Sequence, residues 1–306
     1  MRALNEKFMS DLLNGSLTPI LNAVRSDDTL VLELRGTYVN VYYRGGSLYR
    51  IDQKDGYVFF TFDTDYGMDD ISLPEHPTVV EAPGLIYQYK AAMDKFLTLK
   101  NPKMEREFQQ LMTRLNNRAK IGKASDYYIM DIEYADTDER GLKAKFDMVA
   151  LKWPCTKQDR KITKDLSLAL IELKYGDGAL GGTAGIEKHL DDLADFLGDA
   201  EKLKDFCLDM GAVFRQKCEL GLVPTVPEHK REVTVTAENP EVILAVADHD
   251  PAKPALANVL SALDLNKYNF SLRIATASLL GGALFVECML PIPKYLQMDG
   301  ERSGIS

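Results

Sequence analysis

Apolar residues in the first third of this 306-residue chain follow first a helical and then a strand-like spacing. Leu4, Phe8 and Leu12 lie at helical spacing and predict a helix over residues 3–24. Segments rich in Val, Leu, Tyr and Phe then alternate with glycine-containing turns, which predicts a small antiparallel meander. The expected strands are residues 29–34, 37–43, 47–51 and 57–62, and a further helix is expected at residues 85–99.

A second series of elements begins at Pro102, because proline is favoured in the first turn of a helix. The expected order is helix 103–120, strands 127–135, 142–153 and 166–175, helices 184–197 and 200–220, strand 241–247, helix 255–263, and strands 271–277 and 283–290. Strands that alternate with helices indicate an α/β fold. The length and this change of pattern predict two domains, residues 1–101 and residues 102–306.

Charged side chains occur within the most apolar of the expected strands, residues 166–175. Glu172 and Lys174 are two positions apart, so they project from the same face of that strand. Asp147 lies in the strand before it, and two carboxylates on neighbouring strands would form an oxygen-ligand site for Mg²⁺, with the lysine near a phosphate. The alternative is an exposed ion pair of Glu172 and Lys174, but residues 168–173 have the continuous apolar character of a buried strand.

An Asp in one strand followed by Glu-x-Lys in the next resembles the PD-(D/E)xK nuclease superfamily. The resemblance covers roughly residues 103–290, with Phe146 where the family has proline. The order of helix, three strands, helix and strand is also that of the family. The resemblance implies a restriction-endonuclease-like mixed central sheet flanked by helices. Residues 1–101, with their antiparallel meander and helix, would be an accessory domain.

The same resemblance implies a metal-dependent endonuclease or exonuclease that hydrolyses phosphodiester bonds, with DNA favoured over RNA. Asp147, Glu172 and the main-chain carbonyl of Leu173 are the implied ligands of Mg²⁺, for which Mn²⁺ would substitute. Lys174 would stabilise charge on the phosphate or position a water. The alternative function is a non-catalytic subunit that keeps the nuclease fold and binds nucleic acid or another protein.

Two further candidates come from the positions at which the family often places polar residues. Glu105 and Glu107 lie on different flanks of the apolar stripe of helix 103–120. Glu107 is preferred as a catalytic residue because it shares a helix face with Met104 and Leu111. His189 lies on the helix after Glu-x-Lys, where an imidazole with a near-neutral pKa suits proton transfer or hydrogen bonding to a phosphate or water.

Three other groups have a structural and a functional interpretation. Asp131 and Glu133 share a strand face and either assist the site or pair across the sheet, for instance with a lysine. The basic run at residues 152–164 either contacts a nucleic-acid backbone or is a solvated loop. Tyrosines and arginines at residues 38–50 suit stacking on single-stranded nucleic acid, although packing within the meander is the favoured explanation.

Composition limits the possible partners. A net charge of −9 argues against strong unassisted DNA binding, although bound metal would neutralise some carboxylates. The four cysteines are scattered without the spacing of a zinc site. Apolar runs are shorter than the roughly 18–20 residues of a membrane span, and the N-terminus is too polar for a signal peptide. We therefore expect a cytoplasmic protein without a membrane partner, and a protein partner or homo-oligomer through the N-terminal domain.

Overall fold

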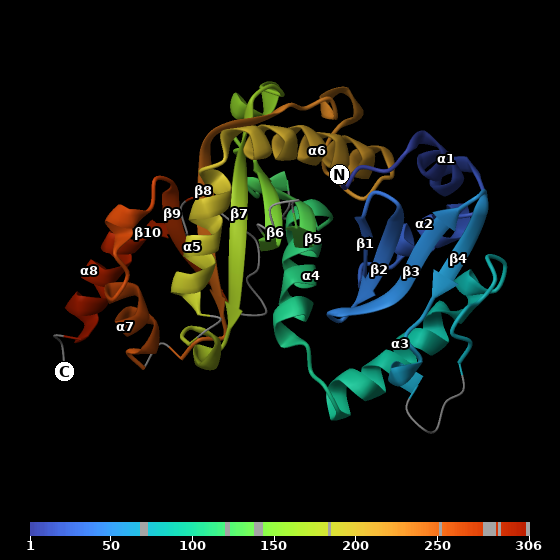
Figure 1. Ribbon diagram of the computed structural model, residues 1–306, viewed down its shortest axis with the longest axis horizontal. Coiled ribbons are helices and arrows are strands. Elements are labelled where there is room, and N and C mark those ends of the chain that lie inside the picture. The colour runs from blue at the N-terminus through green and yellow to red at the C-terminus, as the bar shows by residue number, and fades with distance from the viewer. Residues whose placement is uncertain are drawn as a thin grey trace.

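The computed structural model describes residues 1–67, 73–119, 123–137, 143–182, 185–250, 253–277, 286 and 289–303. Within these residues the chain forms an antiparallel four-stranded sheet and a mixed six-stranded sheet, each with helices packed against it (Figure 1). The fold is therefore mixed α/β, as the sequence predicts. None of the described helices combines the length and apolar character needed to cross a membrane.

The four-stranded sheet is built in chain order. Its strands are β1 (Leu30–Leu34), β2 (Tyr38–Tyr43), β3 (Gly46–Lys54) and β4 (Tyr57–Thr61). Arg44 and Gly45, with φ of 46° and 78°, close the β2–β3 turn. Positive φ at both central residues is the geometry that matches the twist of paired antiparallel strands. The meander predicted from the sequence is confirmed.

The helices beside this sheet differ from the prediction at one point. They are α1 (Glu6–Asn14), α2 (Thr18–Ser26) and α3 (Ala82–Leu99). The single helix expected over residues 3–24 is wrong, because the chain breaks between Gly15 and Leu17. Pro19 lies in the first turn of α2, where its missing N–H is tolerated.

The six-stranded sheet has the order β10-β9-β8-β7-β6-β5. Its strands are β5 (Tyr127–Thr137), β6 (Lys143–Lys152), β7 (Leu166–Tyr175), β8 (Val235–Ala247), β9 (Ser271–Ala277) and β10 (Leu290–Pro291). Strands β5, β6 and β7 are antiparallel neighbours, whereas β7, β8 and β9 are parallel. Most of the expected strand at residues 283–290 lies outside the described residues.

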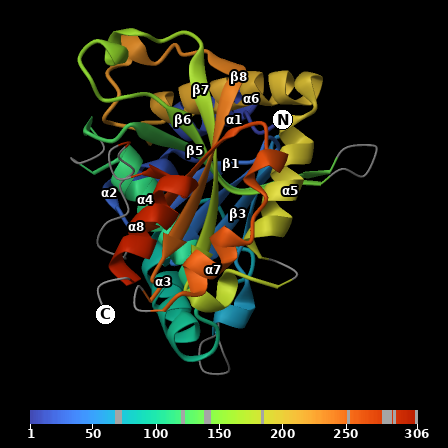
Figure 2. The ribbon, with the colours of Figure 1, turned by 90° about the vertical axis from the view of Figure 1, so that its left-hand side faces the viewer.

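Helices cover both faces of this sheet (Figures 1 and 2). They are α4 (Met104–Asn117) on one face and α5 (Ile186–Leu197) and α6 (Ala200–Glu219) on the other, with α7 (Ala255–Ser261) and α8 (Ile292–Ser303) beyond β9. Met148 and Ile171 share a buried cluster with Phe108 of α4, while Val149 and Leu170 belong to the cluster that includes α5 and α6. The strands are thus buried on both faces, which explains the continuous apolar sequence of β7.

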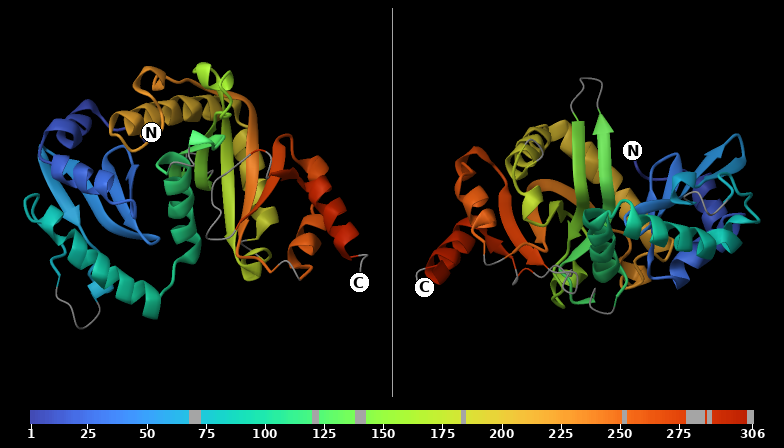
Figure 3. Two further views of the ribbon diagram at one scale, coloured as in Figure 1. Left: turned by 180° about the vertical axis from the view of Figure 1, so that it is seen from behind. Right: turned by 90° about the horizontal axis from the view of Figure 1, so that it is seen from below.

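Buried ion pairs join the two sheets. Lys217 of α6 lies 2.7 Å from both carboxylate oxygens of Glu33 on β1, and both side chains are at most 2% exposed. Arg35 forms an ion pair with Asp131 of β5. The largest apolar cluster also contains residues from both sheets. The boundary predicted between residues 101 and 102 falls in the α3–α4 connection (Figure 3), and the division into two domains stays a prediction.

Candidate functional site

Strands β6 and β7 place Asp147 and Glu172 next to each other. Their ladder ends with Met148 opposite Ile171, so Asp147 and Glu172 are the next residues across from one another. Directly opposed side chains lie on the same face of a sheet. Beyond the ladder, the main-chain N–H of Leu173 donates to Asp147 Oδ2 at 2.8 Å. The carbonyl of Leu173 therefore also points toward β6, because the N–H and C=O of one strand residue face the same side.

Glu172 is the centre of a small polar cluster. Its Oε1 accepts a hydrogen bond from Lys174 Nζ at 2.7 Å and lies 3.1 Å from His189 Nδ1. The Glu172 and Lys174 side chains are only 3% and 7% exposed, whereas that of His189 is 22% exposed. The structure thus brings together four of the predicted site residues, Asp147, Glu172, Lys174 and His189. The first and last of them are 42 residues apart in the sequence.

The helix glutamate beside this cluster is Glu105. Its carboxylate interacts electrostatically with Glu172 and Lys174, and the nearby Tyr175 main chain lowers its pKa. Glu107 instead accepts from Arg44 Nε at 3.2 Å, on the side of α4 that faces the N-terminal sheet. The preference for Glu107 as the helix glutamate at this site is therefore wrong, because Glu105 lies beside the cluster and Glu107 does not.

The physical reason is that α4 is buried on two sides. Phe108 and Met112, the residues grouped with Glu105, are at most 1% exposed and pack on the six-stranded sheet. Leu111, the neighbour used to choose Glu107, is only partly buried and lines a cavity on another side of the helix. A single apolar stripe cannot distinguish two buried faces of one helix.

Three carboxyl groups of this site have raised pKa values. Burial raises the pKa of Asp147 well above its usual range, and the charge of Glu172 raises it further. Burial also raises the pKa values of Glu172 and Glu105, while the charge of Lys174 opposes each shift. Lys174, together with Lys145, whose charge also lowers the pKa of Glu172, does not balance three neighbouring carboxylates, so protons or a bound cation would neutralise part of this charge.

The donor atoms fit a hard divalent cation, although they do not form a closed cage. Among the described residues, no group of three or more His, Cys, Asp and Glu side chains is placed to hold a metal ion. Mg²⁺, however, usually binds one or two protein carboxylates and completes its shell with water and substrate phosphate. Asp147, Glu172 and the Leu173 carbonyl provide oxygen atoms of that kind.

Asp131 lies outside this cluster, whereas Glu133 interacts electrostatically with Glu105. Asp131 is fully buried and pairs with Arg35 and with Arg2, whose Nε lies 3.4 Å away. Glu133, with φ of 51°, pairs with Arg106 at 3.2 Å. Of the two alternatives for Asp131, the structure shows the ion pair, and its partners are arginines from the N-terminal part of the chain instead of a lysine.

The basic loop begins at the opposite end of the β6–β7 hairpin from Glu172. Glu172 is six positions after Leu166 in β7, which corresponds to a distance of roughly 20 Å along the strand. Within the loop, Arg160 donates to the Tyr128 hydroxyl and to the Ser125 carbonyl. These contacts indicate a structural role for Arg160.

The aromatic residues of the meander are also used for packing. Tyr49 is fully buried, and its hydroxyl donates to the carbonyl of Ala82. Arg50 binds both carboxylate oxygens of Asp52 and lies over the Tyr38 ring, 3.7 Å from its centroid. These contacts support the packing explanation that the sequence favours.

We expect Glu105→Gln to lower cleavage and metal affinity more than Glu107→Gln. Only Glu105 interacts with Glu172 and Lys174, and partners of metal ligands typically contribute about 10–100-fold. Both variants would be assayed at a series of Mn²⁺ concentrations. A larger loss for Glu107→Gln would contradict the placement of Glu105 at this site.

Comparison of the chain with protein-family models, with curated proteins and with solved structures finds no match. The function is therefore inferred from the residues of this chain and their geometry.

Proposed function

We propose that the chain is a Mg²⁺-dependent nuclease of PD-(D/E)xK type that hydrolyses phosphodiester bonds, with DNA as the favoured substrate. The observation that carries the proposal is the pair of opposed carboxylates, Asp147 and Glu172, with Lys174 and His189 in contact with Glu172. Burying charged groups is costly unless they are paired or coordinate a metal. The charge excess of the cluster is the kind that a divalent cation would neutralise.

The order of elements supports the restriction-endonuclease-like part of this proposal. Helix α4, antiparallel strands β5, β6 and β7, helices α5 and α6, and strand β8 follow one another along the chain. Strand β8 lies beside β7 and parallel to it. This is the order that the resemblance implies for the nuclease core.

Each residue has a distinct part in the proposed chemistry. Asp147, Glu172 and the Leu173 carbonyl would hold Mg²⁺, which supplies positive charge to the attacked phosphate when it is bound. Lys174 presents its ammonium group beside Glu172 and stabilises negative charge that develops on the phosphate oxygens. His189, whose side chain is 22% exposed, is placed to hold a water or transfer a proton.

His189→Ala is expected to reduce turnover by roughly 10²–10⁴-fold, the effect of a positioned acid–base group. His189→Gln should keep part of the activity, because an amide still donates a hydrogen bond but does not transfer a proton near neutral pH. Both variants would be measured at saturating Mn²⁺. Full activity of the alanine variant together with a lower melting temperature would assign His189 to packing.

An activity screen tests the proposed function directly. Purified protein would be incubated with plasmid, linear duplex DNA, single-stranded DNA and RNA, each with Mn²⁺, with Mg²⁺ and with EDTA. We expect cleavage of DNA that requires the metal and stops in EDTA. Absence of metal-dependent cleavage on every substrate, in protein that melts cooperatively, would overturn the proposal.

A further inference from the structure

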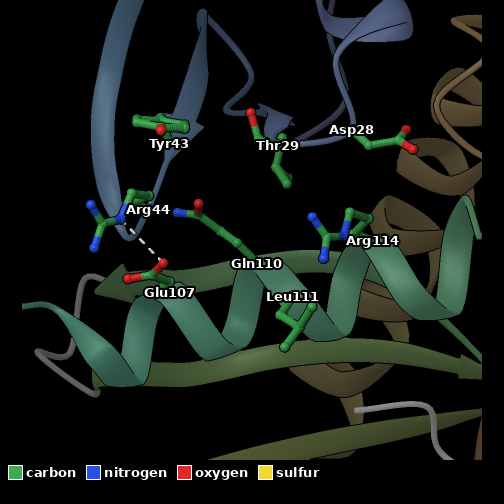
Figure 4. A pocket seen from close by; sticks show the side chains of 9 residues that line it. Asp28, Thr29, Tyr43, Arg44, Glu107, Gln110, Leu111 and Arg114 are labelled. Atoms are coloured by element: carbon green, nitrogen blue, oxygen red, sulfur yellow. Dashed lines mark hydrogen bonds and ion pairs between the residues drawn. The ribbon is translucent and has the colours of Figure 1, made fainter. Parts of the chain in front are cut away.

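A cavity of about 350 Å³ lies between α4 and the N-terminal sheet, away from the carboxylate cluster (Figure 4). It is lined by Asp28, Thr29, Val31, Tyr43, Arg44, Glu107, Gln110, Leu111 and Arg114. Its volume is within the range of small-molecule sites. The β2–β3 turn closes one end, because a Cβ at Gly45 would lie only 2.8 Å from the Lys103 main-chain oxygen. Glycine therefore lets this turn contact the start of α4.

The side-chain amide of Gln110 is the first sign of a ligand. Gln110 is only 6% exposed, yet no hydrogen bond joins its side chain to another residue of the described chain. Its amide extends from α4 into the cavity (Figure 4). An amide that faces a cavity without a protein partner is available to a bound molecule. A ligand with both a donor and an acceptor would satisfy this amide.

Arg114 supplies the charge of the cavity. It lies four residues after Gln110, so the two side chains project from the same face of α4. Its guanidinium forms no ion pair or hydrogen bond with the part of the chain that the structure describes. Glu107 is already paired with Arg44, and Asp28 is paired with Arg118 at 3.2 Å. Arg114 is thus a cationic group of the lining that the described chain leaves without an ion-pair partner.

These groups match the chemistry of a nucleotide. Arginine is suited to phosphate because its planar guanidinium donates two parallel hydrogen bonds. A glutamine amide pairs with the donor and acceptor edge of a base such as adenine. Val31 and Leu111 add apolar surface for the base, which a simple anion would not use. Gln110 and Arg114 are four residues apart, about 6 Å along the helix axis, which leaves space for a sugar between base and phosphate.

We propose that this cavity binds a nucleotide, with its phosphate on Arg114 and its base on the Gln110 amide. The nucleotide is either free in solution or one unit of a single strand, and the chemistry of recognition is the same. The proposal goes beyond the nuclease function, because none of the carboxylates at the β6–β7 site lines this cavity. Cleavage activity and nucleotide binding are separate measurements, so either proposal can fail alone.

Binding would be measured on the full chain in EDTA. AMP and inorganic phosphate would be titrated by calorimetry, and a fluorescein-labelled single strand of about ten nucleotides by anisotropy. We expect saturable binding of AMP or of the strand, and much weaker binding of phosphate alone. Binding of AMP identifies a free nucleotide as a ligand, whereas binding of the strand alone identifies a unit within a strand.

Matched variants locate the binding site. Arg114→Gln and Gln110→Leu should each weaken binding by about tenfold or more, the equivalent of one charge-assisted or buried hydrogen bond. Arg106→Gln and Gln109→Leu are the controls on the same helix, because neither residue lines the cavity. Gln109 is fully buried and its amide also lacks a partner, so it matches Gln110 in all but position.

Three results would overturn the proposal. They are the absence of saturable binding by both AMP and the strand, unchanged affinity in Arg114→Gln, and phosphate binding as tight as that of AMP. Melting curves of each variant establish that it is folded. If Gln110→Leu does not fold, Arg114→Gln decides the outcome alone, because this side chain has no partner to lose within the described residues.

Discussion

Glu172→Gln and Asp147→Asn are expected to abolish metal-dependent cleavage of nucleic acid by this protein. Each substitution keeps the shape of the side chain but removes one of the two opposed carboxylates. Loss of a residue that only supports a metal ligand costs about 10–100-fold, so loss of a ligand should cost at least that much. Lys174→Ala is expected to abolish cleavage as well, while metal binding persists.

Metal binding gives a second measurement that does not depend on turnover. A cation that binds only the folded state raises the melting temperature as its concentration increases. Mn²⁺ and Mg²⁺ should therefore stabilise the parent protein and Lys174→Ala, but neither Glu172→Gln nor Asp147→Asn. The carboxylate variants should remain folded without metal, because each removes one of two neighbouring like charges.

Glu241→Gln is the matched control. Glu241 is 2% exposed, like Glu172, and lies on β8 of the same sheet, where it pairs with Lys152 at 3.3 Å. Its substitution should lower stability without removing cleavage. If Glu172→Gln is folded and cuts nucleic acid at the parent rate, the proposed nuclease site is wrong.

The strand that carries this site could be predicted from the sequence because its signal is local. Residues 166–175 are apolar at nearly every position, so the expected strand and β7 have the same limits. Strand β8 was expected only from residue 241, whereas it begins at Val235. Asn239, with φ of 49°, and Pro240 predict a break, but the strand continues through a register irregularity opposite β7. Neighbouring strands here override local propensity.

The cavity beside α4 and the correct helix glutamate depend on contacts between distant segments. Gln110 and Arg114 appear in the sequence as the polar side of an amphipathic helix. Their position becomes meaningful only because the N-terminal sheet packs over that side (Figure 4). The same packing directs Glu107 toward Arg44 and leaves Glu105 for the carboxylate cluster. The spacing of apolar residues along a helix does not show which other helix or strand packs on each of its faces.

Breaking the buried pair of Glu33 and Lys217 is expected to lower the free energy of unfolding by about 3–5 kcal/mol. Lys217→Ala would leave the Glu33 carboxylate buried without its cation, and Glu33→Ala would leave the ammonium unpaired. The pair joins β1 to α6, so its loss also weakens the contact between the two sheets (Figure 1). Urea unfolding followed by circular dichroism would give each value.

The double variant Glu33→Leu, Lys217→Met separates pairing from packing. Apolar residues of similar size avoid the cost of desolvating two charges, so the double variant should be close to the parent or more stable by about 1–4 kcal/mol. Lys188→Ala is the control, since its i,i+4 pair with Asp192 is exposed and should contribute about 0.3–0.5 kcal/mol. If the single and double variants lose the same free energy of unfolding, the two side chains stabilise the protein through packing and not through their charges.

The same pair should make stability depend on pH with a defined sign. Burial raises the pKa of Glu33 from 4.5 to about 7, although the charge of Lys217 opposes the shift. Between these values the folded protein keeps a proton that the unfolded chain has lost, so the contribution of Glu33 to stability falls as the pH rises from 4.5 through about 7. Glu33→Gln removes this titration. The free energy of unfolding of the parent minus that of the variant should therefore decrease between about pH 5 and pH 8. A difference that is flat over this range and rises with pH only below about pH 4.5 would show that Lys217 holds the pKa of Glu33 below its usual value.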